Sequence, residues 1–516
     1  MGKWMDSYLV RLEDVRRETL AGGGAERLQN QHQLGKLSAR ERIDLLVDPG
    51  SFEEIGSAVR DVRPPFDGRK RPSPSDGVVM GLGQVRGRPT ALYALDFSVL
   101  SGSLGDQAVW KLTDLTKMAG QMRMPIIGMF DSAGERLSLK GGDSGLNGLS
   151  ELLRYTCLYS GVIPRIGLLL GPCTGVMASL PVLYDFLIMN RETAFLWLGG
   201  DKSSAEAGTA EFHMTRSGQC DSLTASDVEA IEKAKDILAY LPQNCWESPP
   251  SIDTGDDPDR REEELLRIMP DNPKFTYDIH EVIEKITDQG DFLELKEDFA
   301  SHLVIGLARF GGLAVGIVAN NPDELSGIME PDSSDKYDRF MMFLDAFNIP
   351  LVTLVDTTAF PPGDRWERLG VIRHGAKLLH SYAHLTCPKI TVVLRRSYGG
   401  ANIVLGCSKM FPDFVYTWPT AEFAPTGPET VVQAVFYKEL AKAKEQGNYD
   451  QVFNQFLGVL KEQFSVLNLA KVWTSYYTTH EVIDPRDTRP RIIKALKAVS
   501  QKHEELPTKR RSIKPA

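Results

Sequence analysis

Two stretches of this 516-residue sequence resemble each other at a nearly constant spacing. The segment GRPTALYALDF begins at Gly87 and resembles GLAVGIVANNP, which begins at Gly312; the apolar run at 125–131 resembles the run at 350–356 at the same spacing. Further along, PRIGLLLGPCTGV from 164 matches PKITVVLRRSYGG from 388, at a spacing shorter by one position. Matching landmarks at one spacing are the signature of an internal duplication. The chain is therefore predicted to contain two related halves.

Each half alternates short apolar runs with a helical pattern. Between the first two matched runs, apolar residues recur every three or four positions, which indicates one buried helix face. Strands and helices that alternate in this way predict an α/β fold with right-handed crossovers. The residues of the two helical stripes are Leu112, Leu115, Ala119 and Met122 in the first half, and Tyr337, Phe340, Leu344 and Phe347 in the second.

Changes in composition suggest four segments. Ser38 and Glu41 form a capping box ahead of an apolar run, so a helical N-terminal arm is predicted over 1–55. The two duplicated domains are expected at 56–250 and 276–516. Between them, 251–275 is rich in proline, aspartate and glutamate and is expected to be a linker.

Composition excludes several classes of protein. The formal charge of −10 argues against a nucleic-acid partner, because phosphate binding needs a clustered positive surface. No apolar run approaches the roughly 18 residues of a membrane-spanning helix, so membrane insertion is not expected. The first residues lack an apolar signal core, which predicts a cytoplasmic protein. The six cysteines form no CxxC pair, so no metal site is predicted.

A turn with small residues follows the last matched strand of each half, at 171–176 and at 398–401. Small residues let a ligand approach the backbone, and the first N–H groups of a following helix lack internal partners. Such a turn can hold an anion or a developing enolate oxygen, as an oxyanion hole does. Two turns suit a reaction with two such oxygens, one on a thioester and one on a ureido ring. The alternative is that the glycines only permit a tight strand-to-helix turn.

A series of longer motifs resembles the carboxyltransferase (beta) subunits of biotin-dependent acyl-CoA carboxylases, the propionyl-CoA carboxylase beta-like family. The resemblance is far more specific than any single glycine pattern. In chain order the motifs are QHQLGKLSARERIDLLVDPGSFEEIGS, DSAGERL, GVIPRIGLLLGPCTG, DAFNIPLVTLVD, GVIRHGAKLLHSYAHLTCPKITVVLRRSYGGA and WPTAEFAPTGPE.

This resemblance implies two tandem crotonase-like domains and a homohexamer built as a trimer of dimers. Acyl-CoA would bind the first half and biotin the second, where the first half of one subunit faces the second half of another. The sequence has neither a Met-Lys-Met biotin acceptor nor an ATP-grasp glycine loop. The implied partners are therefore a biotin carboxylase and a biotin carboxyl carrier protein, or one fused alpha subunit containing both.

The resemblance also assigns site residues. The thioester hole would be the backbone amides of Gly175 and Val176, and the biotin hole those of Gly400 and Ala401. The thioester enolate would capture the carboxyl group while the biotin oxyanion assists removal of the α-proton, so no protein base is implied. The acyl-CoA contacts would be Ser132, Ala133, Gly134, Cys173, Thr174 and Ile403, and the biotin contacts Phe360, Tyr398 and Gly399.

Several positions depart from the family pattern and leave the reaction open. Val176 stands where the family has glycine, Glu135 where it commonly has alanine, and Ile403 predicts a more apolar acyl pocket. Glu135, one residue before Arg136, is either a solvated loop charge or part of a local ion pair. The alternative is that it faces the CoA pocket, where it could favour a polar acyl group or change the direction of transfer. Carboxylation, the reverse reaction of a biotin-dependent acyl-CoA decarboxylase, and an altered or inactive homologue all remain possible.

Two other classes of enzyme have partial signals. The run from Gly171 to Gly175 fits a nucleophile elbow with Cys173 as the nucleophile, but no later histidine has the context of a triad base. The glycines at 81–87 are one residue out of the dinucleotide-binding register and precede a strand instead of opening a helix. The nucleophile-elbow alternative also leaves the second glycine turn unexplained.

Overall fold

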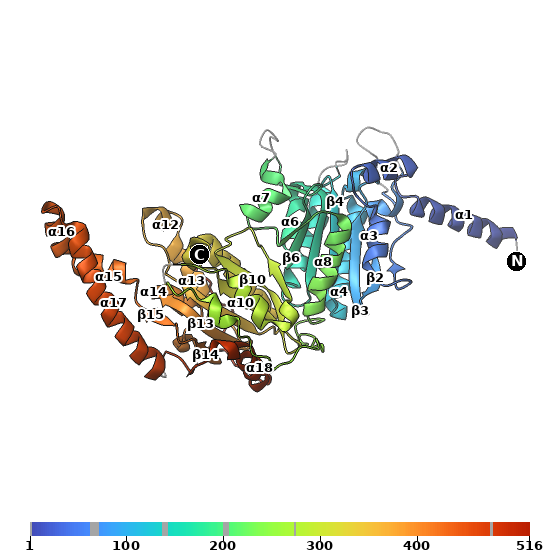
Figure 1. The fold of residues 1–516 in the computed structure, drawn as a ribbon. Helices are drawn as coiled ribbons and strands as arrows, with labels where there is room; N and C mark the ends of the chain where they lie inside the picture. The colour runs from blue at the N-terminus through green and yellow to red at the C-terminus, as the bar shows by residue number, and fades with distance from the viewer. Residues whose placement is uncertain are drawn as a thin grey trace. The chain divides into compact units, whose positions relative to one another are not determined.

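The computed structural model describes residues 3–61, 72–136, 143–199, 206–272, 275–474 and 478–515. The chain forms two compact units, Met1–Ser248 and Pro249–Ala516. Each unit is built on an eight-stranded mixed sheet with helices packed against it (Figure 1). Within the described ranges, no helix is long and apolar enough to cross a membrane. The predicted α/β architecture is confirmed.

The first unit begins with three helices, α1 (Lys3–Leu20), α2 (Ala25–Gln33) and α3 (Ala39–Leu46). Its sheet has the order β1-β2-β3-β4-β5-β6-β8, with β7 paired to β5, and it is parallel from β3 onward. The strands are β1 (Glu53–Glu54), β2 (Val78–Val85), β3 (Arg88–Leu95), β4 (Ile126–Ser132), β5 (Arg165–Thr174), β6 (Phe186–Asn190), β7 (Phe195–Trp197) and β8 (Ser222–Thr224). The connecting helices are α4 (Asp106–Met122), α5 (Asp143–Leu158), α6 (Ser179–Val182), α7 (Ala210–Thr215) and α8 (Asp227–Tyr240), and the 3-10 turns include η2 (Leu100–Gly102) and η3 (Gly175–Ala178).

The second unit repeats this plan. Its sheet has the order β16-β14-β13-β12-β11-β10-β9, with β15 paired to β13. The strands are β9 (Phe292–Leu295), β10 (Leu303–Phe310), β11 (Leu313–Asn320), β12 (Leu351–Thr357), β13 (Lys389–Tyr398), β14 (Phe414–Thr417), β15 (Glu422–Ala424) and β16 (Glu481–Val482). The helices are α9 (Leu265–Ile268), α10 (Ile279–Ile286), α11 (Pro331–Ala346), α12 (Asp364–Arg368), α13 (Val371–Tyr382), α14 (Gly399–Val404), α15 (Pro428–Val435), α16 (Tyr437–Glu445), α17 (Tyr449–Thr474) and α18 (Thr488–Ala498).

The duplication extends to the backbone conformation. Strands β4 and β12 have the same length, as do β5 and β13, and each pair keeps the spacing of its matched sequence runs. The tripeptide Leu-Ser-Gly at 100–102 recurs at 325–327, and every residue of both copies has positive φ. Helices α4 and α5 pack together, as α11 and α13 do in the second unit. The predicted internal repeat is therefore present in three dimensions.

The first duplicated unit begins inside the segment 1–55 that the sequence predicts to be a separate arm. Helix α3 and strand β1 have counterparts in α10 and β9, at a wider spacing than the later strands. In each unit an aspartate after this helix accepts a hydrogen bond from the next hairpin turn: Asp48 from the Gly87 amide at 2.7 Å and Asp288 from the Gly312 amide at 2.6 Å. Residues 39–55 thus belong to the first duplicated unit, and α1 and α2 precede it.

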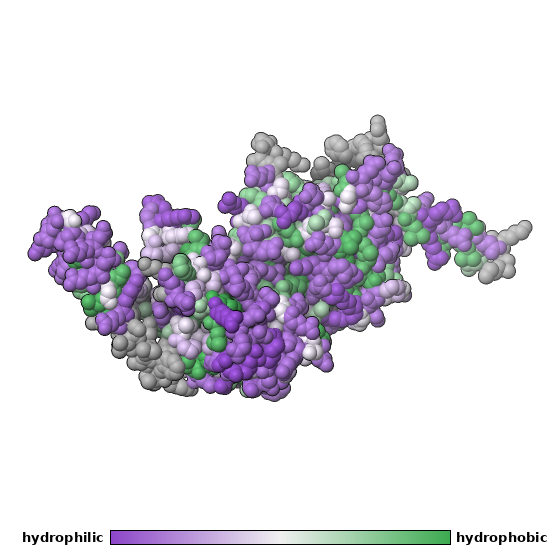
Figure 2. Space-filling model, in the orientation of Figure 1, coloured by the Kyte–Doolittle hydropathy of each residue, from purple (hydrophilic) through white to green (hydrophobic). Residues whose placement is uncertain are grey.

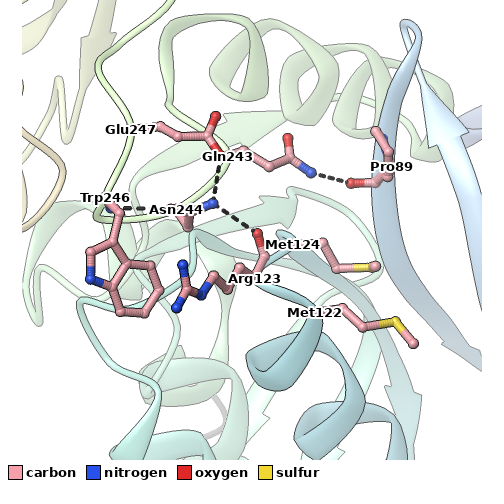
Figure 3. Close-up of a pocket in the computed structure, with 8 residues that line it drawn as sticks. All are labelled: Pro89, Met122, Arg123, Met124, Gln243, Asn244, Trp246 and Glu247. Carbon is pink, nitrogen blue, oxygen red and sulfur yellow. Dashed lines mark hydrogen bonds between the residues drawn. The ribbon is translucent and has the colours of Figure 1, made fainter.

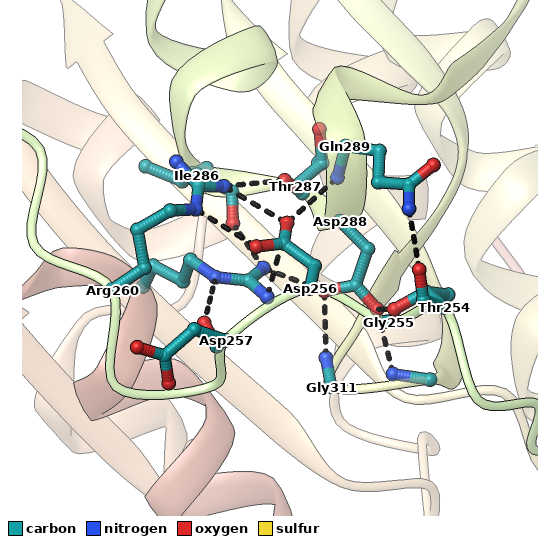
Figure 4. Close-up of polar contacts among 12 residues, drawn as sticks. Thr254, Gly255, Asp256, Asp257, Arg260, Ile286, Thr287, Asp288, Gln289 and Gly311 are labelled. Carbon is teal, nitrogen blue, oxygen red and sulfur yellow. Dashed lines mark hydrogen bonds and ion pairs between the residues drawn. The ribbon is translucent and has the colours of Figure 1, made fainter.

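The segment expected to link the domains belongs to the second unit and is fastened to it by charged contacts (Figure 4). Arg489 on α18 is fully buried and pairs with Asp288 at 2.6 Å and with Asp256 at 3.4 Å. Arg260 pairs with Asp256 at 3.0 Å and donates to the Thr287 carbonyl at 3.1 Å. A buried arginine is tolerated here because acidic and carbonyl oxygens surround it.

The predicted helical stripes mostly form the core. All four stripe residues of α11 and its C-cap are buried, as are Leu112, Leu115 and Ala119 of α4. Burying one large apolar side chain completely stabilises the folded state by about 1.5–3 kcal/mol. Met122 differs, because it is the last residue of α4 and is 55% exposed. On the face shown in Figure 2, hydrophilic residues cover most of the surface. Trp4 and Leu12 of α1 are exposed.

Candidate functional site

In the first unit, the predicted acyl-CoA residues follow two neighbouring parallel strands. Ligands of open α/β sheets bind at the carboxyl ends of the strands. Ser132, the last residue of β4, is in register with Cys173 near the end of β5. Thr174 Oγ1 donates to the Ala133 carbonyl at 2.9 Å, which joins the two strand ends. The structure therefore brings the two predicted segments, 132–134 and 173–176, together at one edge of the sheet.

The loop after β4 uses its own amides. The Ala133 N–H donates to the Ser101 carbonyl at 2.9 Å, and the Gly134 N–H donates to Ser132 Oγ at 3.0 Å. Gly134 has a φ of 96°, and a Cβ on it would lie 2.7 Å from the Thr174 carbonyl oxygen. This close approach requires glycine. Residues 133 and 134 can therefore form a wall of a ligand site, but their amides are not available as donors.

The turn after β5 is the candidate for amide donors. Gly175 has a φ of 73° and begins the 3-10 turn η3, whose first N–H groups have no acceptor within the turn. The Val176 side chain is 40% exposed. Valine, like glycine, keeps a backbone N–H at this position.

Glu135 lies directly against this turn. Its Oε2 is 2.7 Å from the position that a Cβ on Gly175 would occupy. Its Oε1 is buried and has no hydrogen-bond partner among the described residues. Arg136 does not neutralise it, because Arg136 pairs with Asp61 at 2.8 Å and with Asp76. Arg136 is therefore not the ion-pair partner of Glu135, which is partly exposed.

Cys173 cannot act as the nucleophile of an elbow. Its side chain is fully buried. Burial, together with the charges of Glu135 and Asp131, raises the pKa of the Cys173 thiol. The reactive form of cysteine is the thiolate, so this thiol is inert at neutral pH. Only the backbone of Cys173 can line a ligand site, since the side chain lies in the core.

A buried carboxylate beneath the site was not predicted from the sequence. Asp131 is fully buried and accepts hydrogen bonds from Lys36 Nζ at 2.9 and 3.0 Å and from Arg42 at 3.1 Å. Arg42 also donates to Asp227 at 2.8 Å. Gly171 gives this carboxylate its room, because a Cβ there would lie 2.0 Å from Asp131 Oδ1. The sequence feature that could have revealed this carboxylate is the aspartate at the end of the matched apolar run in each half.

The second unit neutralises its equivalent aspartate differently. Asp356 is buried and accepts from Arg395 at 2.9 Å and from Arg396 at 2.7 Å. These arginines stand on β13 where the first unit has Gly171 and Pro172 on β5. The charge compensation that comes from the N-terminal segment in the first unit thus comes from the neighbouring strand in the second.

The predicted biotin residues gather around the turn after β13. Gly399 has a φ of 58° and begins α14. The Phe360 ring lies 3.5 Å from the position that a Cβ on Gly400 would occupy. Tyr398 is buried and its hydroxyl donates to Glu422 in a short hydrogen bond, so that hydroxyl is already used. Ala401 is buried in α14, whereas Ile403 is 42% exposed, and both lie on this helix of the second unit.

The duplication aligns the two turns residue by residue. Since β5 begins at Arg165 and β13 at Lys389, Gly175 corresponds to Gly399 and Val176 to Gly400. The two predicted amide pairs, 175–176 and 400–401, are therefore not at equivalent positions. At the spacing between β4 and β12, Glu135 corresponds to Phe360. The residue before each one accepts an equivalent hydrogen bond. The Leu104 N–H donates to the carbonyl of residue 134 at 2.9 Å, and the Met329 N–H donates to the carbonyl of residue 359 at 3.1 Å.

A pocket of about 530 Å³ lies elsewhere in the first unit (Figure 3). Arg123 and Met124 immediately precede β4, so the pocket is at the amino end of that strand and away from the candidate site. The Arg123 guanidinium lies 4.1 Å from the centre of the Trp246 ring. No group of three or more His, Cys, Asp or Glu in the described part of the chain is arranged to hold a metal ion.

Comparison with known proteins gives the family. The model of the carboxyl transferase domain matches residues 30–513. The propionyl-CoA carboxylase beta chain of Roseobacter denitrificans is 38% identical over 521 residues, covering 98% of this chain and 99% of the relative. The methylmalonyl-CoA decarboxylase subunit alpha of Propionigenium modestum is 34% identical, with 97% of each chain covered.

A solved structure agrees over the whole chain. The transcarboxylase 12S hexamer, with methylmalonyl-coenzyme A and methylmalonic acid bound, matches with a TM-score of 0.91 and 36% identity, covering 100% of this chain and 99% of that one. The tandem crotonase-like fold expected from the sequence is therefore confirmed. With duplicated strand-to-helix turns at the carboxyl edges of both sheets, this chain belongs to the carboxyl transferase domain family, as a member of its propionyl-CoA carboxylase beta-like group.

Proposed function

We propose that this chain is a carboxyltransferase that moves a carboxyl group between biotin on a partner protein and the α-carbon of an acyl-CoA thioester. One observation carries the proposal: the β5–η3 and β13–α14 turns are equivalent, and each opens with a glycine of positive φ. Two equivalent turns in one chain can serve two oxygens that become negative in the same reaction.

In the first unit, the amides of Gly175 and Val176 would hold the thioester oxygen. A donor set made of backbone N–H groups stabilises the enolate more than the neutral thioester, because the charge on the oxygen increases in the transition state. The wall of this site would be formed by Ala133 and Gly134, whose backbones are fixed by hydrogen bonds to Ser101 and Ser132. A fixed wall keeps the acyl group oriented without reorganisation during the reaction.

In the second unit, the amides of Gly400 and Ala401 would hold the ureido oxygen of biotin. Biotin, when bound, supplies the carboxyl group that is transferred. The residues fit such a group: the first turn of α14 offers N–H donors without intrahelical acceptors, and the Phe360 ring beside Gly400 offers an apolar wall. Tyr398 supports this turn through its bond to Glu422 and does not donate to the ligand.

Carboxylation of a short acyl-CoA is the direction that we propose first. A biotin-dependent acyl-CoA decarboxylase is the second candidate, favoured by the likeness to the Propionigenium subunit. An altered or inactive homologue is the third, since Val176 adds a side chain at the first turn where the family has glycine. The proposed assembly is a cytoplasmic homohexamer that receives biotin from a carrier protein and works with a biotin carboxylase, or with one alpha subunit that contains both.

The test uses the purified full chain in two assays. One follows transfer of the carboxyl group from methylmalonyl-CoA to free biotin, and the other follows carboxylation of propionyl-CoA with N-carboxybiotin as the donor. Gly400→Val should abolish both activities and leave thioester binding intact, because the added methyl groups fill the turn beside Phe360. Gly458→Val is the control, since nothing lies within 4 Å of a Cβ at that position. Wild-type protein that binds CoA thioesters but shows no transfer in either direction would contradict the proposal and favour the inactive homologue.

A further inference from the structure

We infer that Glu135 is a specificity-determining residue of the first unit, which disfavours an acyl-CoA whose acyl group carries a free carboxylate. The inference rests on the proposed function, because it assumes that the thioester lies at the turn of Gly175. It adds a residue that the resemblance does not assign, since the family commonly has alanine at this position.

The position of the Glu135 side chain is set by its backbone. Glu135 forms a parallel bridge with Leu104, whose N–H donates to the Gly134 carbonyl and whose carbonyl accepts from the Arg136 N–H, both at 2.9 Å. The residues on either side of Glu135 are thus tied to one loop. From this fixed origin the carboxylate reaches over Gly175, where Oε2 is 2.7 Å from the Cβ position.

The charge of Glu135 is not compensated by the described residues. Oε1 is buried without a hydrogen-bond partner. The neighbouring Arg136 is turned toward Asp61 and Asp76, and its guanidinium also donates to the Ser103 carbonyl. A buried carboxylate oxygen without a donor is costly, so a second carboxylate placed beside it is disfavoured, whereas neutral groups or hydrogen-bond donors are accepted.

The second unit provides an internal comparison. Phe360 stands at the position equivalent to Glu135 and also lies against the glycine turn of its own unit. The two units thus place a side chain over the turn in the same way, but at this position the first unit has a carboxylate and the second an aromatic ring. The charge is therefore not needed for the fold of this loop, which points to a role toward the ligand.

The negative charge of Glu135 acts on the carboxylate that the proposed reaction adds to or removes from the thioester. In a carboxylated thioester such as methylmalonyl-CoA, the carboxylate is attached to the α-carbon, next to the thioester carbonyl. Two like unit charges close together at a partly screened site repel each other enough to reduce affinity by about tenfold. An uncarboxylated thioester has no such charge. Glu135 thus weakens binding of the carboxylated thioester and favours its release.

The experiment measures the dissociation constants of propionyl-CoA and methylmalonyl-CoA by titration calorimetry with the full chain. Glu135→Gln keeps the shape of the side chain and removes its charge, and Glu135→Ala restores the residue common in the family. Glu26→Gln is the control, because Glu26 is an exposed glutamate of α2 in the same unit. Circular dichroism and the oligomeric state establish that each variant is folded.

Both Glu135 variants should bind methylmalonyl-CoA about tenfold more tightly than wild type, with propionyl-CoA changed by less than about twofold. The gain should shrink at high salt, because the repulsion is screened. Unchanged binding of methylmalonyl-CoA, or an equal change for both thioesters, would overturn the inference. If wild-type protein binds neither thioester, the proposed function fails instead, so the two failures are distinguishable.

Discussion

Replacing Gly171 by alanine tests whether the buried carboxylate of Asp131 requires a glycine at this position of β5. The new methyl group would lie 2.0 Å from Asp131 Oδ1 and 2.4 Å from its Cγ. The carboxylate cannot move away freely, because Lys36 and Arg42 hold it on their side and all three groups are buried. Either β5 shifts or Asp131 loses part of its charge-assisted bonding.

Both responses have a known cost. Overpacking of a tight core costs about 1–3 kcal/mol. Separating a buried ion pair costs roughly 3–5 kcal/mol, because uncompensated charges remain. We therefore expect Gly171→Ala to destabilise the first unit by about 2–5 kcal/mol, which lowers the melting temperature of a unit of this size by roughly 5–15 °C.

Differential scanning calorimetry of the full chain measures this change, and limited proteolysis reports which unit opens first. Melting temperatures are compared between variants without a two-state fit, because two units unfold. Gly167→Ala is the matched control on the same strand, since its Cβ would meet atoms no closer than 3.4 Å. A melting temperature for Gly171→Ala within about 2 °C of the control would refute the reasoning.

Two further predictions concern buried groups that the proposed reaction does not use. Lys336 donates to the carbonyls of Lys296 at 2.9 Å and Phe299 at 2.7 Å, and burial lowers its pKa to about 7. Between pH 7 and the ordinary lysine pKa the unfolded chain binds more protons than the folded one, so wild-type stability should rise with pH in this window, by about 2 kcal/mol more than that of Lys336→Met between pH 7 and 9. Equal pH dependence of the two melting temperatures would contradict this. Cys173→Ala should keep transfer activity within about twofold, and iodoacetamide should modify exposed Cys157 long before Cys173, as peptide mass mapping can show. Loss of activity in a folded Cys173→Ala protein would revive the elbow hypothesis.

The sequence predicted the features that depend on local pattern. A constant spacing of matched runs predicted the two sheets, and glycines after apolar runs predicted the turns at Gly175 and Gly399. The pattern could not show which side chains neutralise Asp131, because Lys36 and Arg42 are distant in the sequence and meet it only through folding. Nor could the spacing of the matched runs reveal that α3 and α10 correspond. The first unit has a longer connection between β1 and β2 than the second has between β9 and β10, which changes the spacing there.

The two halves keep the same turn geometry while the residues around each turn differ. At the three positions that surround each turn, the first unit has Glu135, Gly171 and Val176, and the second has Phe360, Arg395 and Gly400. These substitutions alter charge and bulk, yet the equivalent strands keep their length and the glycines that follow them keep positive φ. Donors that are backbone N–H groups survive any side-chain change that leaves this geometry intact. Side chains over the turn are then free to diverge, and under the proposed function they would decide which oxygen-bearing group each turn accepts.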